Sequence, residues 1–185
     1  MVGEKGHGNQ SFPCSFDFRY YKDIYIVKTN LNGAALWQKT HGNEYLEKGT
    51  DIVAKESGGY IIAGEKCDHG YNISSCDNRA KIILLEIDED GNSNQETVLN
   101  NLYFFEAGSP ISISNTSNGG YVFVSKPKNN GYTWFYKWGQ NENSIDLKLE
   151  NAGYGGESIE MSNDGGFIIG TSGSTIIKTD QELNF

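Results

Sequence analysis

The stretch GGYIIAG at residues 58–64 recurs as GGYVFVS at 119–125 and as GGFIIGT at 165–171. Each copy follows a small polar residue, which is a serine, an asparagine or an aspartate. Glycines in this context supply the positive φ angles of a tight hairpin turn between two strands. The three copies therefore predict three hairpins with the same turn at the same place.

A second set of apolar stretches follows these copies, and one more precedes the first copy. The stretches read DIYIVKTN at 23–30, KIILLEID at 81–88, TWFYKWG at 133–139 and STIIKTD at 174–180. Turn residues such as Asn32-Gly33 then lead into a more polar stretch. The repeating unit is thus predicted to contain four antiparallel strands.

The start of the chain keeps the same register, because Gly3-Glu4-Lys5 repeats Gly64-Glu65-Lys66. We expect one β domain over 1–185, in which the first and the last repeat are partial. The repeats cover approximately 1–40, 49–99, 108–151 and 156–185.

Repeated four-stranded units of this size are typical of β-propeller blades. The middle strands are nearly continuous apolar runs, as expected when both faces of a sheet are buried between neighbouring blades. A β-sandwich could bury similar runs, but it would not require the same turn in every unit. The predicted fold class is all-β, a partial β-propeller of about 3.5 to 4 four-stranded antiparallel blades.

The composition excludes several classes of function. The chain has 15 Lys and Arg against 24 Asp and Glu, a net charge of -9, so it would repel a nucleic acid backbone. Its longest uninterrupted aliphatic run, Ile82 to Leu85, is far too short to cross a bilayer. We therefore expect neither nucleic acid as a partner nor insertion into a membrane.

The pattern IVKTN at 26–30, WQKT at 37–40 and GGYIIAG at 58–64 resembles bacterial extracellular β-propeller repeat proteins. Repeats in that family read approximately KTDxxGxxxWxKxxG and then DGGYIIAG. The match weakens between Asn92 and Gly119, where the tryptophan is missing. The resemblance implies a secreted or surface-attached protein with a binding or structural role, and it transfers no catalytic residue.

The chain holds fewer blades than propellers of this kind usually have. It could be a fragment of a longer protein, a four-bladed closure, or an arc that pairs with a second copy. Unpaired edge strands of an open arc would favour association. We expect a fragment or a homodimer that completes the propeller rather than a four-bladed monomer.

Three cysteines are present, Cys14, Cys67 and Cys76, and the last two bracket one loop. A disulfide between Cys67 and Cys76 would restrict that loop and would suit an oxidising compartment. Zinc held by both thiolates and His69 is an alternative, but a fourth ligand and the usual spacing are missing. Free thiols are the third possibility, and Cys14 has no obvious partner.

Alternate positions of one predicted strand carry Tyr132, Trp134, Tyr136 and Trp138, which places them on one face. Aromatic faces stack on sugar rings, so the strand could bind a glycan. Trp134 and Tyr136 align with core positions of the other repeats, so we expect them to be buried. Trp138 lies near the strand end and is the best candidate for an exposed aromatic, with Tyr132 as a second binding candidate.

Asp51, Ser112 and Ser158 fall in one column when the repeats are aligned on their glycine pairs. First strands line the channel of a propeller, so these residues could contact a ligand or could only be solvated. The residues DEDGN at 88–92 resemble the start of a calcium loop, but a tight turn explains them better because no helix flanks them. No metal site and no cofactor is predicted.

Two functions remain. The favoured one is a non-catalytic, secreted or surface-exposed module whose loops bind protein or carbohydrate. The alternative is part of a polysaccharide-active enzyme, a hydrolase or lyase, that uses channel carboxylates such as Asp51, Glu157 and Glu160. The serines that align with Asp51 argue against the enzyme, so no catalytic residue is assigned.

Overall fold

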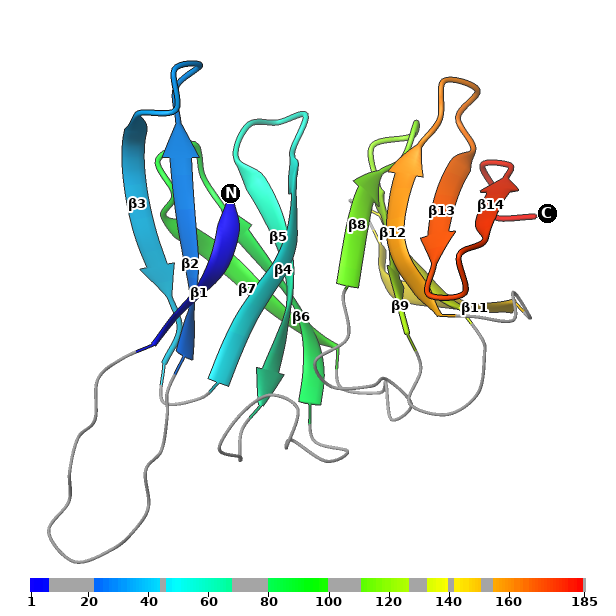
Figure 1. Cartoon of the computed structure of the whole chain (residues 1–185), viewed down its shortest axis with the longest axis horizontal. Coiled ribbons are helices and arrows are strands. Elements are labelled where there is room, and N and C mark those ends of the chain that lie inside the picture. Colours follow the sequence, from blue (N-terminus) through cyan, green and yellow to red (C-terminus); the bar gives the residue numbers. More distant parts are fainter. Residues whose placement is uncertain are drawn as a thin grey trace, which may run out of the picture. The chain divides into compact units, whose positions relative to one another are not determined.

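A computed structural model describes residues 1–6, 22–43, 46–67, 80–99, 111–126, 133–139, 142–150 and 155–184. Every regular element in these ranges is a β-strand, which confirms the predicted all-β class (Figure 1). Within this part of the chain, no helix is long and apolar enough to cross a membrane. The chain forms two compact units, Met1–Tyr103 and Phe104–Phe185.

The first unit is one curled sheet of seven strands. The strands are β1 (Val2–Gly6), β2 (Lys22–Thr29), β3 (Ala35–His41), β4 (Leu46–Ala54), β5 (Tyr60–Cys67), β6 (Ala80–Ile87) and β7 (Ser93–Leu99). Within β1–β3 and within β4–β7, each pair of hydrogen-bonded neighbours is antiparallel. A single parallel pair, Lys22 with Leu46, joins the two groups.

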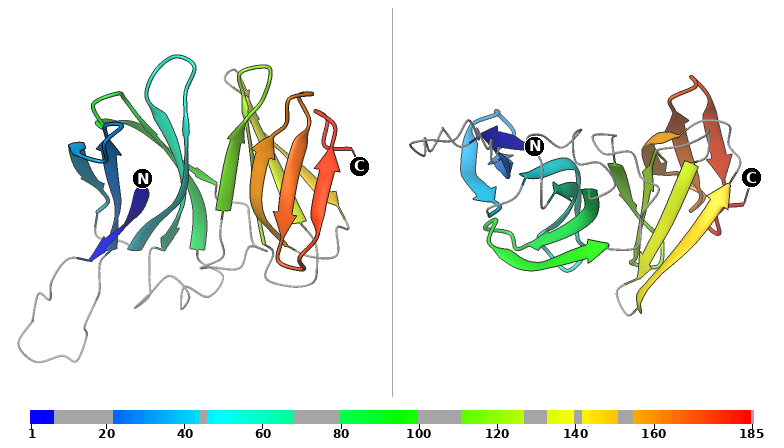
Figure 2. Two further views of the ribbon diagram at one scale, coloured as in Figure 1. Left: turned by 45° about the horizontal axis from the view of Figure 1, so that its top comes forward. Right: turned by 90° about the horizontal axis from the view of Figure 1, so that it is seen from below.

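The second unit contains a sheet of four strands and a sheet of three (Figure 2). The four are β8 (Ile111–Asn115), β9 (Tyr121–Ser125), β10 (Thr133–Gly139) and β11 (Glu142–Glu150), and they pair in chain order. The three are β12 (Gly156–Met161), β13 (Phe167–Thr171) and β14 (Ile176–Thr179). All pairs in this unit are antiparallel.

The glycine pairs form the predicted hairpin turns. In the first, the Lys55 N–H donates to the Gly59 carbonyl at 3.0 Å, and the same bond recurs between 116 and 120 and between 162 and 166. The first glycine of each pair has a positive φ, 89° at Gly58 and 83° at Gly165. The second glycine leaves room for a backbone carbonyl, because a Cβ on Gly166 would lie 2.0 Å from the Thr179 carbonyl oxygen.

A second turn recurs at Asn30, Asp88 and Asp180. Each of these side chains accepts the N–H groups of the residues two and four positions ahead, as Asp88 Oδ1 does from Asp90 at 3.0 Å and from Asn92 at 2.7 Å. Such a turn is a local substitute for backbone pairing. The carboxylate of Asp88 is thus engaged by its own turn, as the interpretation of 88–92 as a turn requires.

Each unit has a core between two sheet faces. Each sheet or strand group has two faces. We call the face that packs on the next sheet or strand group along the chain the leading face, and we call the opposite face the trailing face. In the first unit, Ile24 and Ile26 on the leading face of β1–β3 pack on Ile62, Ile83 and other apolar residues on the trailing face of β4–β7.

In the second unit, Val122, Val124 and Phe135 form the leading face of β8–β11 and are fully buried. They pack on Ile159, Phe167, Ile169 and Ile177 on the trailing face of β12–β14. The two units therefore use the same mode of packing, in which the middle strands of one sheet cover those of the next.

Candidate ligand-binding pocket

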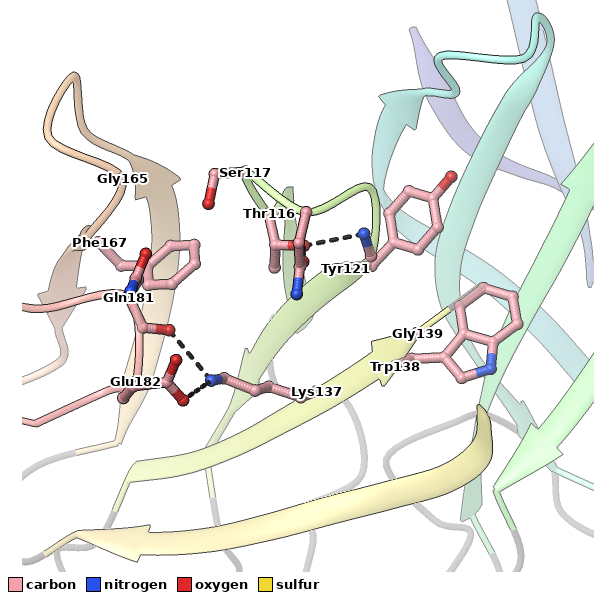
Figure 3. A pocket seen from close by; sticks show the side chains of 12 residues that line it. Thr116, Ser117, Tyr121, Lys137, Trp138, Gly139, Gly165, Phe167, Gln181 and Glu182 are labelled. Atoms are coloured by element: carbon pink, nitrogen blue, oxygen red, sulfur yellow. Dashed lines mark hydrogen bonds and ion pairs between the residues drawn. The ribbon is translucent and has the colours of Figure 1, made fainter. Parts of the chain in front are cut away.

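The second unit holds a pocket of about 360 Å³ at the turn ends of its two sheets (Figure 3). Three turns and one strand end contribute to it. The β8–β9 turn provides Thr116, Ser117, Asn118 and Gly120, the end of β10 provides Lys137, Trp138 and Gly139, and Tyr121, Gly165, Phe167, Gln181 and Glu182 complete the lining. Its size is at the lower end of the range for sites of small ligands.

An ion pair forms one side of the pocket. Lys137 Nζ donates to the carbonyl oxygen of Gln181 at 3.0 Å and to Glu182 Oε2 at 3.1 Å. Both side chains are partly open to solvent. Figure 3 shows Lys137 extending toward Gln181 and Glu182. Because the ion pair can rearrange in solvent, Lys137 and Glu182 are available as a donor and an acceptor for a ligand.

Polar side chains surround Gly165 on another side. A Cβ on this glycine would lie 3.8 Å from Ser117 Oγ and 3.9 Å from Gln181 Oε1, so both groups are close to the turn. Phe167 lies beside them, but it is 1% exposed and belongs to the apolar core of this unit. A ligand with several hydroxyl or amide groups matches this lining.

The turn beside Gly165 is fixed by charge. Lys178 Nζ lies 2.6 Å from Asp164 Oδ2, and Asp164 also accepts from Ser162 and from the Gly166 N–H. The hydrogen bond from Lys178, followed by those from Ser162 and Gly166, holds the pKa of Asp164 well below its usual range. The Asp164 carboxylate is therefore a structural anion of the turn.

Trp138 is half-buried, and Figure 3 shows its ring on the side of β10 opposite Lys137. The ring packs on Tyr121, with 5.5 Å between centroids and 32° between planes. Tyr136, two residues earlier, is buried as expected and stacks on Phe123 at 4.6 Å. Tyr132 and the side chain of Trp134 lie outside the described part of the chain.

The aligned column of Asp51, Ser112 and Ser158 is only partly open to a ligand. The register places them opposite Ala63, Val124 and Gly170, which are equivalent positions of the second strands. Asp51 is half-buried in the first unit and accepts the Ile52 N–H at 2.8 Å. Ser158 is exposed on β12.

Ser112 corrects the expectation of a ligand contact or a solvated side chain. It is buried, and its Oγ accepts the backbone N–H of Ile159 at 3.2 Å. Ser114 accepts the N–H of Met161 at 3.0 Å in the same way. Both serines face β12 and bind its backbone, so Ser112 is a structural link between two sheets.

Replacing Ser112 with alanine is expected to lower the free energy of unfolding by about 1 to 2 kcal/mol, because the buried Ile159 N–H loses its acceptor. The matched control is Ser158→Ala, at the equivalent but exposed position, with an expected change under about 0.5 kcal/mol. Urea denaturation followed by circular dichroism measures both. Equal midpoints for the two variants would contradict the structural role of Ser112.

Cys67 is disulfide-bonded and 1% exposed. The other two cysteines, Cys14 and Cys76, lie outside the described residues, as does His69. The predicted pairing of Cys67 with Cys76 therefore stays a prediction.

The comparisons with known proteins concern the fold alone. No protein family model matches the chain, and no curated protein does. One similar solved structure is described as a protein of unknown function from Bacteroides caccae. It superposes with a TM-score of 0.55 at 15% sequence identity over 91% of this chain. The match covers 53% of that protein, so this chain spans about half of its length.

Proposed function

We propose that the chain is a non-catalytic binding module, built as part of a β-propeller, whose pocket in the second unit takes a saccharide. The observation that carries this proposal is the pocket lining. Hydroxyl, amide and carboxylate groups from three turns surround one space together with the Lys137 ammonium from the end of β10. Sugars carry many hydroxyl groups that both donate and accept hydrogen bonds, so they match such a polar lining.

The propeller architecture is supported by repetition within the chain. Strands β4–β7 and β8–β11 are four-stranded antiparallel meanders that pair in chain order. The same turn links the first two strands in three sheets, and the leading face of one sheet packs on the trailing face of the next in both units. Sheets repeated in this way are the building principle of propellers.

Binding is favoured over polysaccharide cleavage by the acidic residues. Glycoside hydrolysis by the common mechanisms needs two carboxylates at a defined separation. Among the described residues that line the pocket, Glu182 is the one carboxylate. Glu157 and Glu160 are exposed on β12 and do not contribute to the lining.

A secreted or surface location is part of the proposal. The disulfide at Cys67 supports it, because disulfides persist mainly in oxidising compartments. The resemblance of the repeats to bacterial extracellular propeller proteins points the same way.

A panel of neutral and acidic oligosaccharides tests the proposal, first on an array and then by isothermal titration calorimetry. We expect at least one oligosaccharide to bind. Ser117→Trp, which places a large side chain at the exposed rim of the pocket, should then weaken binding about tenfold or more, equivalent to about 1.4 kcal/mol. Lys137→Met should also weaken binding, because it removes the cation while keeping most of the side-chain volume.

The matched control is Glu56→Trp, at the equivalent exposed position of the β4–β5 turn in the first unit. It should leave the affinity unchanged. Binding that survives Ser117→Trp would place the ligand elsewhere. Release of reducing sugar from any polysaccharide in the panel would contradict the non-catalytic role.

A further inference from the structure

The leading face of β12–β14 is exposed, although the equivalent face of β8–β11 is buried. The register makes the two faces comparable, because Ile168 pairs with Lys178 as Val122 pairs with Lys137. Ile168 is 45% exposed, whereas Val122 is fully buried. The leading face of β8–β11 is thus covered by the next sheet, whereas the equivalent face of β12–β14 is uncovered.

The next pair of positions shows the same contrast. Gly170 pairs with Ile176 as Val124 pairs with Phe135. Ile176 is 77% exposed, and Phe135 is fully buried. Ile168 on the central strand β13 and Ile176 on the edge strand β14 are diagonal neighbours on one face, and together they form an apolar surface that a partner could cover.

The trailing face of β1–β3 is open in a complementary way. Met1 and Val27 exchange backbone hydrogen bonds, and they occupy the positions of Ile62 and Leu85 in the following strand group. Met1 is 87% exposed and Val27 is half-buried, whereas Ile62 and Leu85 are buried. In the first unit, Ile62 and Leu85 are among the residues that receive the preceding leading face.

A lysine occupies one equivalent position on the leading faces of β1–β3, β8–β11 and β12–β14, whereas β4–β7 has Glu86 there. In the first two of these three, the lysine contacts the next sheet or strand group of its unit. Lys28 Nζ donates to the Glu89 carbonyl at 3.3 Å, and Lys137 Nζ donates to the equivalent Gln181 carbonyl at 3.0 Å. Lys178 is the equivalent residue of the last sheet. The accepting carbonyl belongs in each case to the residue after the aspartate of the turn. In β1–β3 the residue at this position is Leu31, which follows Asn30, and its side chain is fully exposed.

We propose that the chain self-associates head to tail, with the leading face of β12–β14 covered by the trailing face of β1–β3 from a second copy. A second copy is the occupant that the observations favour, because each chain carries both halves of a contact that the two units already make internally. Head-to-tail contacts of this kind either close into a ring or add further copies in a row.

Light scattering over a concentration series tests this inference on the 185-residue chain. The mass should reach at least twice the 20.5 kDa of one chain. Ile176→Glu, on the leading face, and Thr40→Glu, on the trailing face opposite Tyr25, should each return it to that of one chain. Both residues are exposed, so circular dichroism should show that both variants fold.

An equimolar mixture of the two variants tests the head-to-tail geometry. It retains one intact contact, between the leading face of the Thr40→Glu chain and the trailing face of the Ile176→Glu chain. The mass should therefore rise again on mixing. Ser57→Glu, in an exposed turn of the first unit, is the control and should associate like the unchanged chain.

A wild-type chain that stays at the mass of one chain up to its solubility limit would overturn the inference. So would association that persists in Ile176→Glu, or a mixture of variants that remains monomeric. The saccharide experiment is independent of these results, because the pocket is lined by residues of one chain and neither substitution touches its lining.

Discussion

Replacing Gly59 with alanine is expected to lower the free energy of unfolding by about 4 kcal/mol. Gly59 has a φ of 80°, which costs an alanine about 1 to 2 kcal/mol. A Cβ at this position would also lie 2.2 Å from the Ile87 carbonyl oxygen, so the β4–β5 turn and the end of β6 would have to move apart. Urea denaturation followed by circular dichroism measures the loss.

Gly33→Ala separates the two causes. Gly33 also has a φ of 80°, but a Cβ there would meet no atom within 4 Å. This control should therefore lose only the conformational part, about 1 kcal/mol. If Gly33→Ala and Gly59→Ala destabilise the protein equally, close approach of the backbone is not the reason for the second glycine.

Glu47→Gln is expected to change how stability depends on pH. Glu47 is 1% exposed, and its Oε1 lies 3.6 Å from Lys66 Nζ. Burial raises the pKa of Glu47 from 4.5 to about 7, and the attraction of Lys66 offsets only part of this effect. The folded state therefore binds a proton that the unfolded state has already released, and stability falls as the pH rises from 4.5 to about 7.

Glutamine does not titrate, so the variant lacks this loss. Between about pH 4 and about pH 8, the wild type should lose about 3 kcal/mol relative to Glu47→Gln. Lys66 keeps Glu96 as a partner at 2.9 Å in the variant, so its ammonium stays paired. Urea denaturation at a series of pH values measures the difference, and Glu56→Gln at an exposed site is the control. Parallel profiles for wild type and Glu47→Gln would refute the raised pKa.

The hairpins could be predicted from sequence because their chemistry is local. A positive φ and a close backbone carbonyl each require glycine, and both requirements are therefore visible in the sequence. The pairs at 58–59, 119–120 and 165–166 locate the turns without knowledge of the fold. The strands on either side follow from the apolar runs. The same reasoning predicted burial of Tyr136, since its position aligns with core residues of other repeats.

The role of Ser112 could not be predicted in this way. Alignment of repeats places Ser112 and Ser158 in the same column, yet one is buried against β12 and the other is exposed. The difference depends on which sheet stands beside each strand, and that is a property of the tertiary arrangement. A column of aligned residues shares backbone geometry but does not share neighbours.

The pocket was missed for a related reason. Gln181 and Glu182 follow the last strand, far in sequence from Lys137, and nothing near them suggests a shared site. The available signal was the recurrence of lysine at 28, 137 and 178, one or two positions before the ends of β2, β10 and β14. A cation repeated at one register position indicates a contact with the next sheet, and the pocket lies beside such a contact.

The bonds from Ser112 and Ser114 also bear on aggregation. Strand β12 lies at the edge of its sheet, and the unpaired amides of an edge strand are the usual sites at which a foreign strand adds. Here the outward amides of Ile159 and Met161 already have side-chain acceptors. Their hydrogen exchange should accordingly be slow for an edge strand. Addition of a foreign strand along β12 is therefore disfavoured, while the leading face of the same sheet stays exposed.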